Sequence, residues 1–133
     1  MSITLADRAH ELIRPPVVVA ENEPLTGVAH TLWQESVGAV IVGTAAKPAG
    51  ILTERDLVAA LGRGADPTSV TATDVMTSPI VAVRPDDPLL DVAYLMFDDV
   101  IRHVPVIDDL GRVTGIVSVR DLLRPLLIDA LSS

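Results

Sequence analysis

Apolar residues along the chain recur at two spacings, one typical of helices and one typical of strands. Over residues 25–33 they fall at i, i+3, i+4, i+7 and i+8, and residues 89–97 repeat that spacing, which predicts two amphipathic helices. Short β-branched runs bounded by turn formers predict strands at 17–20, 39–42, 50–52, 80–83, 103–107 and 113–117. Further helices should begin at Thr53 and Ser118. We expect Gly62 to end the first of these, and Pro125 to interrupt or kink the second.

These predicted elements occur twice, in the same order. A shift of 64 residues places Pro15-Pro16-Val17-Val18-Val19 over Pro79-Ile80-Val81-Ala82-Val83, and Val40-Ile41-Val42 over Val104-Pro105-Val106. After one inserted residue, Gly50–Leu57 matches Gly115–Leu122. We therefore expect two β-α-β-β-α repeats, over residues 5–62 and 73–130, joined by a linker at 63–72. A short helix at Thr73-Asp74-Val75-Met76 should lead into the second repeat.

A single repeat of about 60 residues builds only a marginal core, and its small sheet needs a cover. We expect the two repeats to pack about a pseudo-twofold axis, giving a mixed α/β (α+β) fold. That arrangement would leave two related clefts between the repeats, which are common places for small ligands.

The most informative polar pattern is Thr53-x-x-Asp56 with its copy Ser118-x-x-Asp121, each at a strand-to-helix turn. One interpretation is a capping box, in which hydroxyl and carboxylate satisfy backbone N–H groups at the helix start. The other is a ligand site, because helix N-termini attract anions and acidic side chains accept hydrogen bonds from ribose. The two roles do not exclude each other.

Composition excludes several classes of protein. Apolar residues make up 49% of the chain, against 21% charged, which rules out a disordered polyelectrolyte. The net charge of −8 and the aromatic content of 2% argue against nucleic-acid binding. No apolar run is long enough for a membrane span, the acidic start lacks an export signal, and there is no cysteine. We therefore expect a cytoplasmic protein without disulfides.

Other candidate chemistry is weak. His10, His30 and His103 are far apart in sequence and lack metal-ligand spacing, so no metal site is predicted. Paired aspartates lack EF-hand spacing and are interpreted as turn residues. Arg55 and Arg120, beside the motif aspartates, are either solvated or in contact with phosphate. No nucleophile–base pattern or P-loop stands out, so no catalytic residue is predicted and an enzyme using Asp121 and His103 is the least favoured hypothesis.

The duplicated motifs together resemble tandem CBS domains, also called a CBS pair or Bateman module. The resemblance rests on the two Gly-hydrophobic-hydrophobic-(Thr/Ser)-x-x-Asp-Leu segments, on Gly64-Ala65-Asp66-Pro67 followed by Asp74-Val75-Met76-Thr77, and on Arg102–Asp108. It covers residues 5–127, so the resemblance leads us to expect a stand-alone CBS-pair protein.

The resemblance implies binding of AMP, ADP, ATP or S-adenosylmethionine in the clefts, and a homodimer. Ribose would be held by Asp56 and Asp121, with Thr53 and Ser118 approaching phosphate. The remaining positions that it implies are apolar contacts to adenine at Pro16, Val18 and Ile80, a pocket position at Thr77, and phosphate contacts at Arg102 and His103.

Two functions follow as hypotheses. The first is a non-catalytic sensor module whose adenosine ligand regulates an unidentified effector protein. The second is a structural or adaptor homodimer with vestigial clefts. In the alignment of the two repeats, Arg102-His103 corresponds to Gly38-Ala39, and Thr77 corresponds to Ile13. Because of these differences, one cleft should bind anionic nucleotides more tightly than the other. Trp33 and Phe97 are expected to pack in the core, with a dimer surface as the alternative.

Overall fold

The computed structural model describes residues 3–132, which form two compact units. One unit consists of residues 16–80. The other combines the N-terminal segment up to Pro15 with the chain from Val81 onward. The N-terminal segment therefore belongs to the unit that contains the second repeat's sheet.

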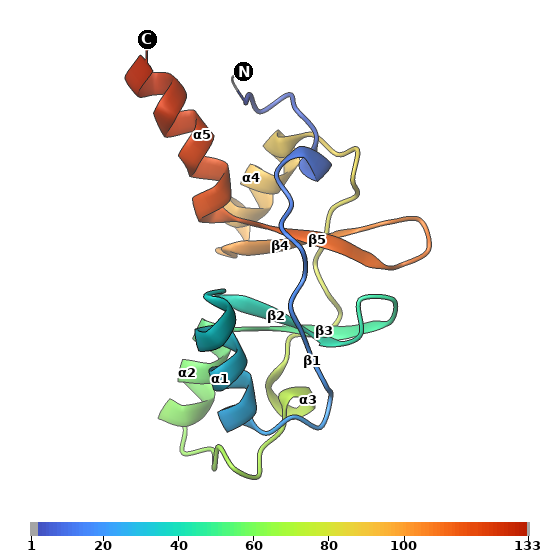
Figure 1. The fold of residues 1–133 in the computed structure, drawn as a ribbon, viewed down its shortest axis with the longest axis vertical. Coiled ribbons are helices and arrows are strands. Elements are labelled where there is room, and N and C mark those ends of the chain that lie inside the picture. Colours follow the sequence, from blue (N-terminus) through green and yellow to red (C-terminus); the bar gives the residue numbers. More distant parts are fainter. Residues whose placement is uncertain (1–2, 133) are drawn as a thin grey trace. The chain divides into compact units, whose positions relative to one another are not determined.

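The unit of residues 16–80 contains a three-stranded sheet covered by helices (Figure 1). Its strand order is β1-β2-β3, with β1 parallel to β2 and β2 antiparallel to β3. Along the chain its elements are β1 (Val18–Val19), α1 (Leu25–Glu35), β2 (Ala39–Gly43), β3 (Pro48–Thr53), α2 (Glu54–Gly62) and α3 (Ala72–Val75). This is the predicted β-α-β-β-α order, followed by the predicted short helix.

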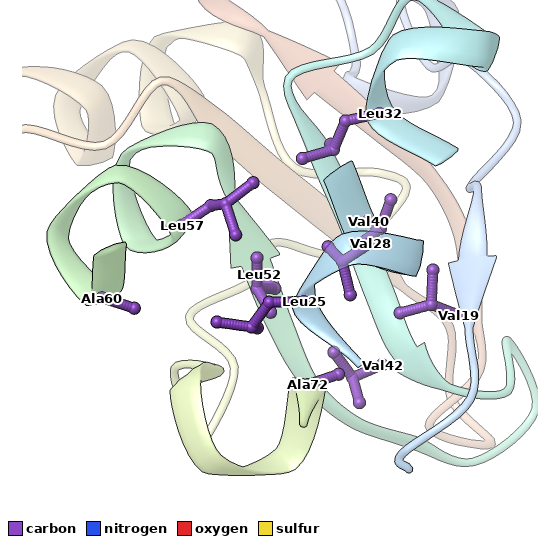
Figure 2. Close-up of a cluster of buried hydrophobic side chains, with 10 residues drawn as sticks. All are labelled: Val19, Leu25, Val28, Leu32, Val40, Val42, Leu52, Leu57, Ala60 and Ala72. Carbon is purple, nitrogen blue, oxygen red and sulfur yellow. The ribbon is translucent and has the colours of Figure 1, made fainter. Parts of the chain in front are cut away.

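The core of this unit lies between the sheet and its helices. Leu25, Val28 and Leu32 of α1 point inward at the predicted helical spacing, against Val40 and Val42 of β2 (Figure 2). The cluster is completed by Val19, Leu52, Leu57, Ala60 and Ala72. Every strand and helix of the unit thus contributes to one hydrophobic core, which fixes the turn between β3 and α2.

The other unit has the same plan with a smaller sheet. Its elements are the 3₁₀ helix η1 (Ala9–Glu11), α4 (Leu89–Asp98), β4 (His103–Ile107), β5 (Val113–Ser118) and α5 (Val119–Ser132). Strands β4 and β5 pair antiparallel. The buried core comprises Ala9, Val83, Leu89, Val92, Val104, Val106, Val117 and Leu122.

The strand predicted at residues 80–83 is reduced to one parallel bridge between Val83 and Val106. In the first unit the Ile41 N–H donates to the Val17 carbonyl at 2.8 Å and extends the pairing of β1. The equivalent residue of Ile41 is Pro105, which has no N–H to donate. The pairing therefore stops at Val83.

Two further expectations differ from the structure. Pro125 was expected to interrupt or kink its helix, but α5 runs through Pro125 without interruption, so the interruption was wrong and the kink stays a prediction. Trp33 and Phe97 are 84% and 82% exposed and lie outside the core. At 100° per residue, Trp33 lies about 100° from the middle of the buried stripe of α1. Over residues 3–132, no helix has the length and apolar character needed to cross a membrane.

Candidate functional site

Each unit has one Thr/Ser–Asp pair at a turn that leads directly from a strand into a helix. At α2 the Asp56 N–H donates to Thr53 Oγ1 at 3.2 Å, and the Thr53 N–H donates to Asp56 Oδ2 at 2.9 Å. At α5 the Asp121 N–H donates to Ser118 Oγ at 3.1 Å, and the Ser118 N–H donates to Asp121 Oδ2 at 3.4 Å. The capping interpretation is therefore correct at both positions. In both cases capping uses Oδ2, so Oδ1 can accept other hydrogen bonds.

The strand beside each motif places a second pair of residues next to the turn. His103 is the register partner of Ser118, and the Val119 N–H donates to the Arg102 carbonyl at 2.8 Å. Arg102 is exposed and His103 is half-buried. In the first unit Ala39 and Gly38 occupy the same two backbone positions. The basic residues predicted to meet phosphate therefore lie beside the Ser118 turn. The Thr53 turn has no basic side chain at these two positions.

Two irregular segments pair with the motif strands, one with β3 and the other with β5. Each lies at the strand edge that is not paired within the sheet. Thr77 exchanges two backbone hydrogen bonds with Ile51, at 2.8 and 3.1 Å. Arg14 does the same with Ile116, at 2.9 and 3.0 Å. Because Ile51 and Ile116 are equivalent, the structural counterpart of Thr77 is Arg14. The expected pairing of Thr77 with Ile13 was wrong by one residue.

Glycine in the motif strands permits this close approach. A Cβ at position 115 would lie 2.6 Å from the Ile13 Cβ and 2.9 Å from the Arg14 carbonyl oxygen. A Cβ at position 50 would lie 2.8 Å from the Thr77 carbonyl oxygen. The Gly of the Gly-hydrophobic-hydrophobic-(Thr/Ser) motif thus places Arg14 and Thr77 against their strands.

The Asp121 carboxylate is paired with a cation. Arg14 Nε donates to Asp121 Oδ1 at 2.7 Å. The Asp121 side chain is 9% exposed, whereas that of Arg14 is 64% exposed. Asp56 is half-buried, and no cation of the described residues pairs with it. The two motif carboxylates therefore have different electrostatic surroundings, although their capping geometry is the same.

A shallow, wide-open cavity of about 350 Å³ lies beside Asp121, within the unit that contains α5. Two arginines, one glutamate and several apolar side chains surround it. The lining residues are Glu11, Leu12, Ile13, Arg14, Asp121, Arg124, Pro125 and Ile128.

Sequence reasoning missed Arg14 and Arg124 as residues of this cavity. Aligning Pro16, instead of Pro15, with Pro79 would have placed Arg14 opposite Thr77. Helical periodicity could have found Arg124, which lies three residues after Asp121 and so on the same helix face.

The predicted adenine contacts lie in the unit of residues 16–80. Val18 is 38% exposed and pairs with Ile41, while Pro16 and Ile80 are half-buried at the two ends of the unit. Their contact with adenine stays a prediction. Within residues 3–132, no three His, Asp or Glu side chains are grouped to hold a metal ion.

Comparison with known proteins gives the same two-repeat organisation. The CBS domain profile matches residues 9–63 and 72–128. A relative from Methanopyrus kandleri, the uncharacterized protein MK0525, is 35% identical over 117 residues, which is 86% of this chain and 60% of that protein. This chain spans between 48% and 66% of the length of three curated relatives that it matches.

Solved structures agree closely with the fold. A CBS domain protein from Pyrobaculum aerophilum, complexed with AMP, has a TM-score of 0.82 at 32% identity, covering 95% of this chain and 99% of that one. The CBS domain pair of protein MJ0100, complexed with 5′-methylthioadenosine and S-adenosyl-L-methionine, has a TM-score of 0.84 at 26% identity. That match covers 93% of this chain and 98% of the other. With two matched domains over most of its length, this chain belongs to the CBS-domain family.

Proposed function

We propose that this protein is a non-catalytic regulatory module that binds adenosine-type ligands at Asp56 and Asp121. The observation that carries the proposal is the duplicated turn in which a Thr or Ser and an Asp cap a helix through Asp Oδ2, so that Asp Oδ1 lies outside the cap. At Asp121 this second oxygen accepts from Arg14 Nε. Complexes of similar CBS proteins with AMP, and with 5′-methylthioadenosine and S-adenosyl-L-methionine, support this ligand class.

The chemistry of the turn suits a nucleoside ligand. A carboxylate can accept hydrogen bonds from two ribose hydroxyls, and the helix N-terminus favours an anion such as phosphate. At the Ser118 turn, Arg102 and His103 would add positive charge or donors. AMP, ADP, ATP and S-adenosylmethionine are the proposed ligands, and none of them acts as a catalytic cofactor.

Regulation requires that the ligand bind two states of the module with different affinity. An effector protein that recognises one of these states is therefore part of the proposal.

Thermal unfolding with and without ligand tests the function. AMP, ADP, ATP and S-adenosylmethionine are compared with GTP as the control nucleotide. A ligand at a hundred times its Kd adds about 2.7 kcal/mol per site, which raises the Tm by several degrees in a domain of this size. The double variant Asp56→Ala/Asp121→Ala should lose this shift.

The Asp74→Ala variant is the matched control, because Asp74 also accepts from the N-cap backbone of its helix, with Thr71 N–H to Oδ2 at 3.0 Å. It should lose stability through its cap and keep the ligand shift. Absence of a shift in the wild-type protein with all four adenosine ligands would overturn the sensor proposal.

A structural or adaptor homodimer is the second candidate, and exposed apolar stripes favour it. Leu90, Tyr94 and Phe97 follow one another at helical spacing on α4 and are 44–82% exposed. On α5 a similar exposed stripe is formed by Leu123, Leu127 and Leu131. On the other unit, α1 exposes Trp33 and α2 exposes Val58 and Leu61.

Large exposed apolar surfaces are typical of protein–protein contacts, and we propose a second copy of this chain as the partner.

A further inference from the structure

We infer that Arg14 makes the Asp121 site selective for anionic adenosine ligands over neutral ones. This inference rests on the proposed function and adds a specificity-determining residue to it. It starts from the bond between Arg14 Nε and Asp121 Oδ1, at 2.7 Å.

The Arg14 side chain is held in place by its backbone. Both its N–H and its carbonyl are bonded to Ile116 of β5, and the strand of Ile116 leads within two residues to Ser118, the N-cap of α5. Pro15 and Pro16 follow Arg14 and restrict the backbone on its other side. The guanidinium therefore starts from a fixed point beside the carboxylate.

The buried carboxylate needs a partner at Oδ1. Leaving a nearly buried charge without compensation is costly, and the charge-assisted bond to Arg14 is stronger than a bond from a neutral hydroxyl. The ribose hydroxyls of a neutral ligand therefore compete with Arg14 for Oδ1 at a disadvantage.

An anionic ligand changes this competition. Arg14 donates only Nε to Asp121, and its side chain is 64% exposed, so its terminal N–H groups are not used in the bond to this carboxylate. Arg14 also lines the adjoining cavity, together with a second cation, Arg124, and one further carboxylate, Glu11. A phosphate there would supply a new anionic partner for the guanidinium. The cost of weakening the Arg14–Asp121 bond is then offset for AMP and not for adenosine.

The Asp56 site provides the internal comparison. Thr77 occupies the position of Arg14 there, and the Asp56 carboxylate has no cation partner among the described residues. Asp56 therefore accepts ribose hydroxyls without displacing a guanidinium, and a ligand phosphate gains no arginine at this position. The preference for AMP over adenosine should be smaller at Asp56 than at Asp121.

Exchange of the two residues tests the inference. Calorimetric titration gives Kd for AMP and for adenosine at one site at a time, with Asp56→Ala leaving the Asp121 site and Asp121→Ala leaving the Asp56 site. In the Asp56→Ala background, Arg14→Thr should lower the AMP-to-adenosine preference about tenfold, through loss of a charge-assisted contact. In the Asp121→Ala background, Thr77→Arg should raise it.

Arg112→Thr is the matched control, because it removes an arginine whose Nε donates to Asp108 at 2.9 Å in the same unit. It should leave the preference unchanged. Arg14→Gln keeps most of the side-chain volume and should act like Arg14→Thr. Agreement of the two variants would show that the effect comes from loss of the guanidinium and not from a folding defect.

The possible results separate the two proposals. If the wild-type protein binds neither AMP nor adenosine, the proposed function fails and this inference with it. If both ligands bind but the Arg14 and Thr77 exchanges leave the preference unchanged, or weaken both ligands equally, the inference alone is overturned. Opposite changes in preference from the two exchanges would support it.

Discussion

Three aspartates, two in turns and one in α3, hold hydrogen bonds that favour their ionised form. The hydroxyl of Thr68 lowers the pKa of Asp66, the backbone N–H of Thr71 lowers the pKa of Asp74, and the backbone N–H of Arg112 lowers the pKa of Asp108. Asp108 also accepts from the Leu110 N–H at 2.9 Å, so it organises the turn between β4 and β5.

These shifts predict a loss of stability in acid. A carboxyl group whose pKa is lower in the folded protein contributes stability above its ordinary value of 3.8, and that contribution disappears as the pH falls through the folded value. The urea midpoint should therefore decrease below about pH 4. In Asp108→Asn, which does not titrate, this decrease should be smaller.

Glu21→Gln is the control for this acid titration, because it removes an exposed carboxylate that has no hydrogen bond in the described part of the chain. The decrease of its urea midpoint in acid should be the same as that of the wild-type protein. If Asp108→Asn also matches the wild type, the turn aspartate does not contribute to the pH dependence.

At the residue scale, the chain pattern predicted the capping residues and missed the ion pair. Thr53–Asp56 and Ser118–Asp121 were recognisable because capping depends on local spacing. Arg14 and Asp121 are 107 residues apart, and their contact depends on the register of an irregular segment against β5. A one-residue error at Pro15-Pro16 was enough to place Ile13 where Arg14 lies.

At the scale of elements, each repeat has one residue with a left-handed backbone shortly after its first helix. Ser36 is the first residue after α1, with φ 53°, and Val100, the equivalent residue of the second repeat, is the second residue after α4, with φ 54°. Backbone bonds support the first turn, because the Val37 N–H donates to the Leu32 carbonyl at 3.1 Å. Serine tolerates this conformation better than valine, because a β-branched side chain crowds the backbone there.

Replacing Val100 should therefore stabilise the protein. Val100→Gly removes the left-handed penalty of about 1–2 kcal/mol, offset in part by the greater freedom of glycine in the unfolded chain. We expect a net gain of about 1 kcal/mol in the free energy of unfolding, measured by urea denaturation.

Val58→Gly is the matched control, since Val58 is as exposed as Val100, at 69%, and lies within α2. Glycine inside a helix should lower stability by about 0.5 kcal/mol. Destabilisation by both substitutions would contradict the assignment of backbone strain to Val100.

The elements were predictable where their signal was periodic or local. The inward face of α1 and the strands β2 to β5 follow the apolar pattern directly. Two differences came from single prolines. Pro105 lacks the N–H that would extend pairing to the segment before Val83, whereas Pro125 does not interrupt α5.

At the scale of the whole molecule, the internal repeat predicts the fold class. It did not predict which chain segments pack together. Residues 3–15 precede the first repeat's strand, yet Arg14 bonds to β5 of the second repeat, and Thr77 bonds to β3 of the first. These pairings join residues distant in sequence, and they bring Arg14 to Asp121.

The homodimer is also a prediction about the whole molecule. With a mass of 14.1 kDa per chain, light scattering after gel filtration should give twice that value for the wild-type protein. Phe97→Glu and Leu127→Glu place a charge in the exposed stripes of α4 and α5. Each should weaken association by about 2 kcal/mol or more, as at buried interface positions, and shift the measured mass toward one chain.

Leu110→Glu is the control for these substitutions, because Leu110 is 74% exposed in the turn between β4 and β5, outside both stripes. It should keep the wild-type mass. A wild-type mass of one chain at micromolar concentration would overturn the dimer. If the dimer persists while no adenosine ligand raises the Tm, the adaptor function replaces the sensor, because the helical stripes would then be the working surface and the motif aspartates would serve only as helix caps.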